Sequence, residues 1–381
     1  MKTVGLVCEF NPFHNGHRYL LTQLRTQGAE AIVCCMSGNF TQRGEPALIS
    51  KTLRAKAALQ NGADLVIELP VVFGCAGAER FAFGGAAHLN ALGVCDTLAF
   101  GSESAGTEDL LKAAQAVTDE SLKEPLQACL SQGMTFAAAR EQAVRERFGE
   151  ETARLLREPN HILGVEYCKA LQTLKSPMKP HAVRRQGVPH DSQQTRDGYA
   201  SASALRNMLQ NGEDISPYVP ENTLPLLDSH PLFGKQQQER LGLMLLYRLK
   251  SMTLEELSAL PHMSEGLENR LFRSIRQGQT VEEILSLVKC KRYPLSRLRR
   301  CLLHAFLHLN HDDFCTQPQY LHILGFSHRG QTLLRQMKST ASLPVLQRRA
   351  DRKGLSPAAK HLLALEDTAD TLYQLPFTTQ P

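Results

Sequence analysis

The sequence lacks long apolar runs and paired cysteines, and both absences restrict what the protein can be. No apolar run approaches the roughly 20 residues needed to cross a bilayer, and the first residues show no signal-peptide pattern, so no membrane association is expected. The 10 cysteines include no C-x-x-C pair, which argues against zinc and disulfides and favours inert thiols in a reducing compartment. We therefore predict a cytoplasmic protein without a metal site of its own.

Several familiar catalytic motifs are missing as well. The chain has no Walker phosphate loop, and neither a Ser-His-Asp set nor paired catalytic carboxylates can be recognised. It has no internal repeat and no low-complexity segment, which leaves an ordinary globular protein. With 381 residues and 42% hydrophobic content, the chain is too long for one core, so two domains are expected.

Positive charge is concentrated in the second half of the chain. Residues 221–381 contain 21 lysines and arginines against 15 acidic residues, whereas residues 1–220 contain 22 against 23. The whole excess behind the net charge of +5 therefore lies in the C-terminal half. Such an asymmetry favours a polyanionic partner for that half, and favours nucleic acid over a membrane surface.

The first half alternates between strand and helix patterns. Single helices between buried strands imply right-handed crossovers and a parallel sheet, so residues 1–215 are expected to form a Rossmann-like α/β domain. Ligands of such sheets bind beyond the carboxyl ends of the strands. The strands are predicted at 4–8, 31–36, 64–69, 95–100 and 179–185, and the clearest helices at 51–61, 78–92, 161–173 and 201–212.

The second half has a different pattern. Four prolines within residues 216–234 predict a linker between two domains. Apolar residues at helical spacing then predict an all-α domain over residues 235–371. Residues 372–381 are expected to form a loose tail.

The most informative segment is GLVCEFNPFHNGHRYL, residues 5–20. A short apolar strand breaks at an Asn-Pro pair, and a helix restarts at Asn-Gly with His14 and His17 at its mouth. A strand that turns straight into a helix presents unpaired N–H groups and the positive end of the helix dipole to an anion. Two imidazoles there suit a polyphosphate whose charge grows as a leaving group departs. H-x-G-H at such a turn resembles the nucleotidyltransferase superfamily, which uses ATP, so His14 and His17 are the catalytic candidates.

A second phosphate clamp is a candidate farther along the chain. Arg184 and Arg185 follow a predicted strand, and a helix begins near Ser201 and Ser203, with Arg206 in its first turns. Hydroxyl groups would cap this helix while guanidinium groups add fixed positive charge. A capped surface helix with solvated arginines is the alternative, and it would be preferred if H-x-G-H were absent.

Two loops are further candidates for the pocket. In the loop 37–46, Asn39, Gln42 and Arg43 are expected to line the acceptor side, although a plain solvated turn has the same composition. Gly101 follows the fourth strand and would let an adenine or ribose lie against bare backbone. An ordinary turn at the end of a strand explains Gly101 equally well.

Basic residues cluster between positions 270 and 300. A solvated helix face normally mixes both signs, whereas this segment has nine cations against Glu282 and Glu283. With Tyr293 interleaved, the pattern fits contact with a phosphate backbone and stacking on bases. The predicted RNA-binding residues are Arg270, Arg273, Arg276, Lys289, Lys291, Arg292, Arg297, Arg299 and Arg300.

Taken together, these motifs resemble one bacterial family. The segments NPFHNGH, MSGNFTQRGEPAL, KTLRAKAALQNGADLVIELP, FGSE, PNHILGVEYCKAL and KRYPLSRLRR are similar to those of the tRNA(Met) cytidine acetate ligases. They extend from residue 5 to about residue 300, and the run from Asn11 to Pro70 is far more specific than H-x-G-H alone. The resemblance implies a nucleotidyltransferase-like domain followed by a helical tRNA-binding domain.

The resemblance also implies a reaction and its ligands. Acetate would attack the α-phosphate of ATP, with Mg²⁺ at the phosphates, and the resulting acetyl-adenylate would acetylate N4 of the wobble cytidine C34 of elongator tRNA(Met). No stable protein partner is implied. This chain departs from the family's pattern at His161, where asparagine is commoner in the family, and at Tyr199-Ala200, which precede SASALR. ATP would be bound by Val7, Cys8, Glu9, Phe10, Asn11, Pro12, Phe13, His14, Asn15, Gly16, His17, Arg18, Tyr19, Leu20, Gly101, Asn160, Arg184 and Arg185.

Two alternative functions stay open at this point. A small-molecule adenylyltransferase or acyl-adenylate ligase shares H-x-G-H but has no need of clustered cations in a helical half. A non-catalytic RNA-binding protein that responds to nucleotide would bind ATP through His14 and His17 without any turnover.

Overall fold

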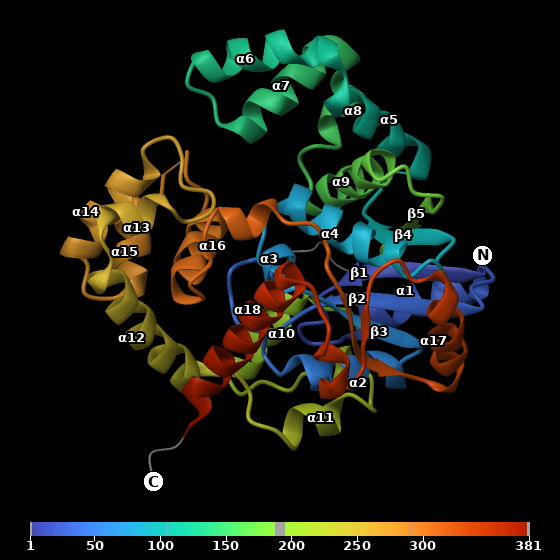
Figure 1. Ribbon diagram of the computed structural model, residues 1–381. Helices are drawn as coiled ribbons and strands as arrows, with labels where there is room; N and C mark the ends of the chain where they lie inside the picture. The colour runs from blue at the N-terminus through green and yellow to red at the C-terminus, as the bar shows by residue number, and fades with distance from the viewer. Residues whose placement is uncertain (1, 105, 187–194, 291, 379–381) are drawn as a thin grey trace.

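The computed structural model describes residues 2–104, 106–186, 195–290 and 292–378. The described residues form one seven-stranded sheet in the order β5-β4-β1-β2-β3-β6-β7, seen near the centre of Figure 1. The first five strands along the chain are parallel, which confirms the predicted Rossmann-like α/β class. The strands are β1 (Thr3–Cys8), β2 (Ala31–Ser37), β3 (Leu65–Leu69), β4 (Thr97–Ser102), β5 (Lys179–Arg184), β6 (Leu321–Phe326) and β7 (Val345–Leu346).

The central strands are continuous apolar runs because helices cover both faces of the sheet. Ile32 and Cys34 of β2 face the core shared with α1 and α2. Val33 and Cys35 face the opposite core, which contains residues of α4 and α9. These four helices span Asn15–Thr26 (α1), Lys51–Gln60 (α2), Ala78–Ala91 (α4) and Pro159–Thr173 (α9).

Two helical groups extend from the sheet (Figure 1). The first lies between β4 and β5, and the second follows the sheet domain and encloses its own apolar core around Leu249, Leu271 and Leu302. The first group is α5 (Thr107–Thr118), α6 (Lys123–Ser131), α7 (Phe136–Phe148) and α8 (Glu150–Arg154). The second is α12 (Lys235–Ser251), α13 (Leu254–Ser258), α14 (Leu267–Gln277), α15 (Val281–Val288) and α16 (Leu295–Phe306).

The C-terminal region is helical as expected, but two strands depart from the all-α prediction for residues 235–371. β6 pairs antiparallel with β3, and β7 pairs parallel with β6, so the end of the chain returns to the sheet. β6 is a six-residue, half-buried strand whose partner lies about 250 residues earlier, so local periodicity could not reveal it. Helices α17 (His328–Thr340) and α18 (Pro357–Gln374) complete this region.

The predicted linker and tail are packed segments. Residues 216–234 contain α11 (Leu224–Asp228), and its Leu226 and Leu227 are buried against the sheet domain. The residues from 372 onward, predicted to be a loose tail, instead form the end of α18 and a short 3₁₀ helix, Leu375–Phe377. Residues 379–381 lie outside the described ranges. The division into two domains stays a proposal.

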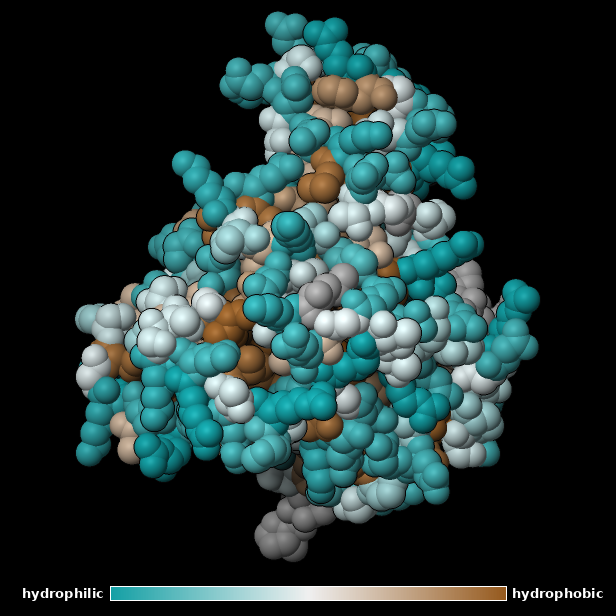
Figure 2. All heavy atoms as spheres, turned by 90° about the vertical axis from the view of Figure 1, so that its right-hand side faces the viewer, coloured by the Kyte–Doolittle hydropathy of each residue, from teal (hydrophilic) through white to brown (hydrophobic). Residues whose placement is uncertain are grey.

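Apolar side chains are spread thinly over the surface that Figure 2 shows. Hydrophilic residues cover most of this face, and the hydrophobic ones form small separate groups. No helix in the described parts of the chain is both long and apolar enough to cross a membrane. The 10 cysteines are free thiols, and Cys315 is the exposed one.

The C-terminal helix is tied to the sheet by a buried ionic cluster. Lys51 Nζ lies 2.5 Å from Glu68 Oε1 and 2.6 Å from Asp370 Oδ2. Glu366 Oε2 lies 3.9 Å from the same nitrogen, and His322 of β6 bonds to Glu68 at 2.5 Å. Burial alone would lower the pKa of Lys51, but the three carboxylates outweigh it and raise that pKa. One ammonium group therefore joins α2, β3 and α18, and β6 joins through Glu68.

Replacing Lys51 tests this cluster. Lys51→Ala should lower the free energy of unfolding by about 3–5 kcal/mol, because the buried carboxylates lose their compensating charge. Urea unfolding followed by circular dichroism measures the change. Lys56→Ala, exposed on the same helix, is the matched control and should change stability by less than about 0.5 kcal/mol. Equal effects of the two substitutions would contradict the assigned role of Lys51.

Candidate active site

The turn between β1 and α1 fixes the two histidines through the backbone. His14 is the N-cap of α1, and its Nδ1 accepts the Gly16 N–H at 3.0 Å. The Nδ1 of His17 accepts the His14 N–H at 3.3 Å, and the two rings stack with centroids 3.7 Å apart. Since both Nδ1 atoms are acceptors, each neutral imidazole carries its proton on Nε2.

Gly16 is required by this close approach. A Cβ at position 16 would lie 2.9 Å from His14 Cε1, which is closer than a carbon atom can approach. The ring of His17 also meets the edge of Phe10, whose backbone has a φ of 50°. The sequence N-P-F-H-N-G-H therefore presents two oriented imidazoles at the start of a helix, where the dipole favours an anion.

These histidines lie in a pocket at the carboxyl edge of the parallel strands, as predicted from the topology. Its lining joins the β1–α1 turn with the ends of β4 and β5 and with the helices α4, α9 and α10 (Ala202–Gln210). The predicted residues that line it are Val7, Cys8, Glu9, Phe10, Asn11, His14, Gly16, His17, Tyr19, Leu20, Gln42, Arg43, Gly101, Asn160, Arg184, Arg185, Ser203 and Arg206.

Six predicted residues do not line the pocket. Asn15 donates from Nδ2 to the carbonyls of Gly198 and Pro217, both at 3.0 Å, and Arg18 lines a separate hollow nearby. The others are Pro12, Phe13, Asn39 and Ser201, of which Phe13 is a core residue. Residues 187–194, between β5 and α10, lie outside the described ranges.

The second clamp divides into one structural residue, Ser201, and four residues that line the pocket, Arg184, Arg185, Ser203 and Arg206. Ser201 caps α10, since its Oγ accepts the Ala204 N–H at 3.0 Å. Ser203 and Arg206 line the pocket, and Arg206 Nη1 donates to the carbonyl of Asn11 at 2.8 Å. That bond connects the start of α10 with the β1–α1 turn, so both helix N-termini adjoin one pocket.

The loop after β2 is held by the C-terminal half. Arg300 Nη1 donates to the Gln42 carbonyl at 3.3 Å, and Arg299 pairs with Glu45. Gly44 has a φ of 76°, and a Cβ there would lie 2.5 Å from the backbone nitrogen of Arg300. The loop that carries Gln42 and Arg43 is therefore positioned by α16.

Asn39 has a structural role in this loop. Its Oδ1 accepts the Lys51 N–H at 2.7 Å, and its Nδ2 donates to Asp370 at 2.9 Å. The side chain is buried and faces the ionic cluster rather than the pocket. The interpretation of Asn39 as an acceptor-side residue therefore has no support in the geometry.

Glu9 is the one carboxylate among the described residues that line the pocket. Its Oε1 accepts the Gln42 N–H at 2.7 Å, which also fixes the loop. Burial raises the pKa of Glu9, while that N–H and the nearby Arg54 act in the opposite direction. Arg54 is fully buried and donates to the Glu9 carbonyl at 2.5 Å. Sequence analysis did not single out Arg54, because nothing local marks an arginine in a helix as buried.

Several pocket residues were not among the predicted site residues. Phe81 of α4 and Leu163 and Tyr167 of α9 line the pocket, as does Phe100 of β4. In the sequence these are apolar residues at core spacing, and only the packing of α4 and α9 beside β4 shows that they reach the pocket. Their apolar surfaces provide a place for a base.

The predicted RNA-binding cations have mixed roles. Five hold the fold together: Arg270, Arg276, Arg297 and Arg300 donate to backbone carbonyls, and Arg299 pairs with Glu45. Arg273, Lys289 and Arg292 are exposed, and Arg273 bonds only within its own helix among the interactions of the described residues. Lys291 lies outside the described residues. RNA binding by this segment stays a proposal.

Two side-chain groups in the described residues have the composition of a metal site. Glu68, Glu366 and Asp370 surround the Lys51 ammonium, so a cation already belongs to that group. The other is Glu103, Glu158 and His161, which adjoins Asn160 at the edge of the pocket.

Comparisons with known proteins indicate the same kind of ligand site as the geometry of the pocket does. A family model described as HIGH nucleotidyl transferase matches residues 1–381. The tRNA(Met) cytidine acetate ligase of Latilactobacillus sakei is 38% identical over 379 residues, which are 98% of this chain and 93% of the relative. That of Caldanaerobacter subterraneus is 36% identical over 363 residues, which are 93% of this chain and 90% of the relative.

Two solved structures also match the whole length of this chain. The crystal structure of apo Thermotoga maritima TmcAL has a TM-score of 0.94 at 32% identity and covers 100% of this chain and 96% of that one. The same protein bound with alpha-thio ATP has a TM-score of 0.90 at 33% identity, with coverages of 100% and 95%. Fold, oriented imidazoles and family model together define a nucleotidyltransferase of the HIGH type. Within that class, the chain belongs to the tRNA(Met) cytidine acetate ligase family.

The oriented imidazoles predict a specific loss on mutation. His14→Ala and His17→Ala should each slow pyrophosphate release from ATP by about 10²- to 10³-fold, because each removes a donor aimed at developing charge. Release is followed with a coupled phosphate assay, and melting temperatures check folding. His181→Ala, on β5 and bonded to Gln27, is the control and should leave the rate unchanged. A loss below about tenfold in both pocket variants would contradict this role.

Proposed function

We propose that the protein is an ATP-dependent ligase that forms acetyl-adenylate and transfers the acetyl group to N4 of the wobble cytidine C34 of elongator tRNA(Met). The observation that carries the proposal is the pocket in which two backbone-oriented imidazoles face a second helix N-terminus with Ser203 and Arg206. Membership of a family whose members are named tRNA(Met) cytidine acetate ligase supports the choice of substrates.

The first step activates acetate. A carboxylate oxygen of acetate attacks the α-phosphorus of ATP, and the bond from that phosphorus to the bridging oxygen breaks as pyrophosphate leaves. The Nε2–H groups of His14 and His17 donate to the phosphates as charge moves onto the leaving group. Arg206 and the amides at the start of α10 stabilise the same charge. The carboxylate thereby becomes a mixed anhydride with a good leaving group.

The second step makes the amide. The N4 amine of cytidine attacks the acetyl carbonyl, the carbonyl–oxygen bond to AMP breaks, and the amine loses one proton. Cytosine N4 is a weak nucleophile because its lone pair is delocalised, so positioning against the anhydride has to supply much of the rate. The exposed cations Arg273, Lys289 and Arg292 of the helical region would bind the RNA backbone that brings C34 to the pocket.

Mg²⁺ belongs to the proposal as a partner of the phosphates. Mg²⁺ prefers oxygen ligands and is commonly bound by one or two carboxylates together with substrate phosphates. Glu9 is the pocket carboxylate that fits, because among the described residues the Gln42 N–H bonds to its Oε1 and not to its Oε2. When bound, the ion would neutralise charge on the departing pyrophosphate.

Acetate as the acyl donor and a cytoplasmic location complete the proposal. Both follow from the reaction, since acetyl transfer from an adenylate needs no coenzyme A and the tRNA substrate is present in the cytoplasm. No stable protein partner is required by this chemistry. A small-molecule adenylyltransferase is the less favoured function, because it gives no reason for exposed cations on the helical region.

The experiment that tests the function measures both steps with purified protein. Pyrophosphate release from ATP should depend on acetate, and elongator tRNA(Met) should contain N4-acetylcytidine at C34 by mass spectrometry of nuclease fragments. A C34→U34 transcript is the control and should not be acetylated. Pyrophosphate release that needs neither acetate nor tRNA would contradict the proposal.

The proposed RNA-binding cations can be separated from the structural ones. The triple variant Arg273→Ala/Lys289→Ala/Arg292→Ala should weaken tRNA binding at least tenfold and lower the salt slope by about one per lost phosphate contact. Acetate-dependent pyrophosphate release should stay unchanged. Lys112→Ala, an exposed cation on α5, is the control for general charge effects. An unchanged salt slope in the triple variant would move the RNA site elsewhere.

A further inference from the structure

A carboxylate of the FGSE segment, for which no role was predicted, lies behind a residue of the pocket. Glu103 follows β4, and its Oε1 accepts a hydrogen bond from Nδ2 of Asn160 at the start of α9. Asn160 lines the pocket, whereas Glu103 does not. Glu103 also favours the charged form of Arg185, another pocket residue, although burial as the larger effect lowers the pKa of that guanidinium.

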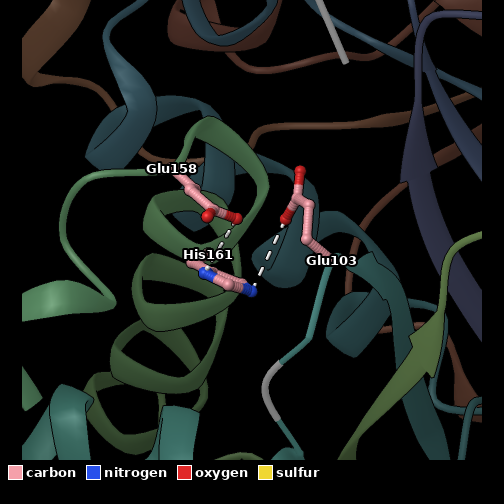
Figure 3. Close-up of side chains that lie close together, drawn as sticks. All are labelled: Glu103, Glu158 and His161. Atoms are coloured by element: carbon pink, nitrogen blue, oxygen red, sulfur yellow. Dashed lines mark ion pairs between the residues drawn. The ribbon is translucent and has the colours of Figure 1, made fainter. Parts of the chain in front are cut away.

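Glu103 is itself held against α9. Figure 3 shows the imidazole of His161 between the carboxylates of Glu103 and Glu158. His161 is 2% exposed, with Nε2 3.6 Å from Glu103 Oε2 and Nδ1 3.5 Å from Glu158 Oε2. The Ser104 N–H donates to the same Nε2 at 3.3 Å, which fixes the segment after β4 against the helix.

His161 Nε2 lies 3.6 Å from Glu103 Oε2 and accepts the Ser104 N–H, so the neutral ring does not donate to that carboxylate. Glu158 and Glu103 approach different nitrogens of the one ring, as the two dashed lines in Figure 3 show. Because Nε2 accepts the Ser104 N–H, the neutral ring carries its proton on Nδ1, toward Glu158. His161 therefore positions Glu103 indirectly, through the backbone N–H of the next residue, Ser104.

The chemistry of the pair settles which way the Asn160 amide points. A carboxylate has only acceptors, whereas an asparagine amide has a donor end and an acceptor end. Glu103 therefore has to face Nδ2, and the Oδ1 end of Asn160 is turned away from it.

The neighbours of Asn160 indicate what its oxygen would meet. Asn160, Leu163 and Tyr167 stand at i, i+3 and i+7 of α9 and so share one face of the helix, and all three line the pocket. Phe100 of β4 adds another apolar wall beside the bare backbone of Gly101. A flat apolar surface with one fixed acceptor at its edge fits a base whose edge carries a donor.

We propose that Glu103 is a positioning residue that fixes Asn160 as a hydrogen-bond acceptor for the N6 amine of adenine, and that this pair selects ATP over nucleotides with an oxygen at position 6. Adenine carries an NH₂ donor there, whereas hypoxanthine and guanine carry an acceptor. An acceptor facing an acceptor loses a hydrogen bond and leaves two polar groups unpaired in a buried place. The inference rests on the proposed use of ATP and goes beyond it by assigning base specificity.

The test compares nucleotide binding by wild type and Glu103→Gln, using ATP, ITP and 2′-deoxyATP in isothermal titration calorimetry. ITP differs from ATP at position 6 without the N2 amine of GTP. Wild type should bind ATP at least about tenfold more tightly than ITP. In Glu103→Gln this preference should fall about tenfold. The glutamine amide can donate to Oδ1 of Asn160, so the Asn160 amide can flip and present its Nδ2 donor to the base.

Control variants separate positioning from stability. Glu103→Asp keeps an acceptor-only partner and should retain the preference, and Glu158→Gln, which leaves the Glu103–Asn160 pair intact, should retain it too. Asn160→Ala should abolish the preference, and this variant decides the question if Glu103→Gln does not fold. Melting temperatures are measured for all variants.

The outcomes also distinguish this inference from the proposed function. An ATP-to-ITP ratio in Glu103→Gln and Asn160→Ala equal to that of wild type would overturn the inference. A changed ratio of ATP to 2′-deoxyATP with an unchanged ratio to ITP would overturn it as well, since Oδ1 would then meet the ribose. Failure of wild type to bind any nucleotide would instead contradict the proposed function.

Discussion

The structure depends on two backbone N–H groups that donate to the Nδ1 atoms of His14 and His17. These bonds fix both ring orientation and the position of the proton, so each imidazole can donate from Nε2 without first losing freedom of movement. They also explain the glycine between the histidines, which lets the His14 ring lie against the backbone. Preorganised donors of this kind stabilise charge that develops during a reaction, because no reorganisation is needed at that moment.

The pocket is nevertheless not a product of the sheet domain alone. Arg300 and Arg299 of α16 hold the loop of Gln42 and Arg43, and Lys51 ties that region to α18 through Asp370. Asn39 bridges the loop and the ionic cluster. The helical region therefore positions one wall of the nucleotide pocket.

Much of the fold could be predicted because its signals are local. Continuous apolar runs such as Ala31–Ser37 exist where a parallel strand is buried on both faces, and the turn with His14 and His17 is contiguous in sequence. β6 could not be predicted, since its identity depends on pairing with β3 across the chain. The same limit applies to charge. From the sequence, Arg297 and Arg300 were expected to bind RNA, whereas in the fold both donate to backbone carbonyls. Glu103 stands in the FGSE segment, but no role for it could be predicted, because its partner Asn160 is a neighbour only in space.

The most direct measurement of the central claim is the tautomeric state of the two histidines. Long-range ¹H–¹⁵N correlation spectra of the imidazoles, assigned with the single His14 and His17 variants, distinguish a proton on Nε2 from one on Nδ1. At neutral pH both rings should carry the proton on Nε2, and added ATP should shift the Nε2 resonances while the Nδ1 atoms remain acceptors. A proton on Nδ1 of either ring in the free protein would contradict the account, because that nitrogen could not then accept the backbone N–H.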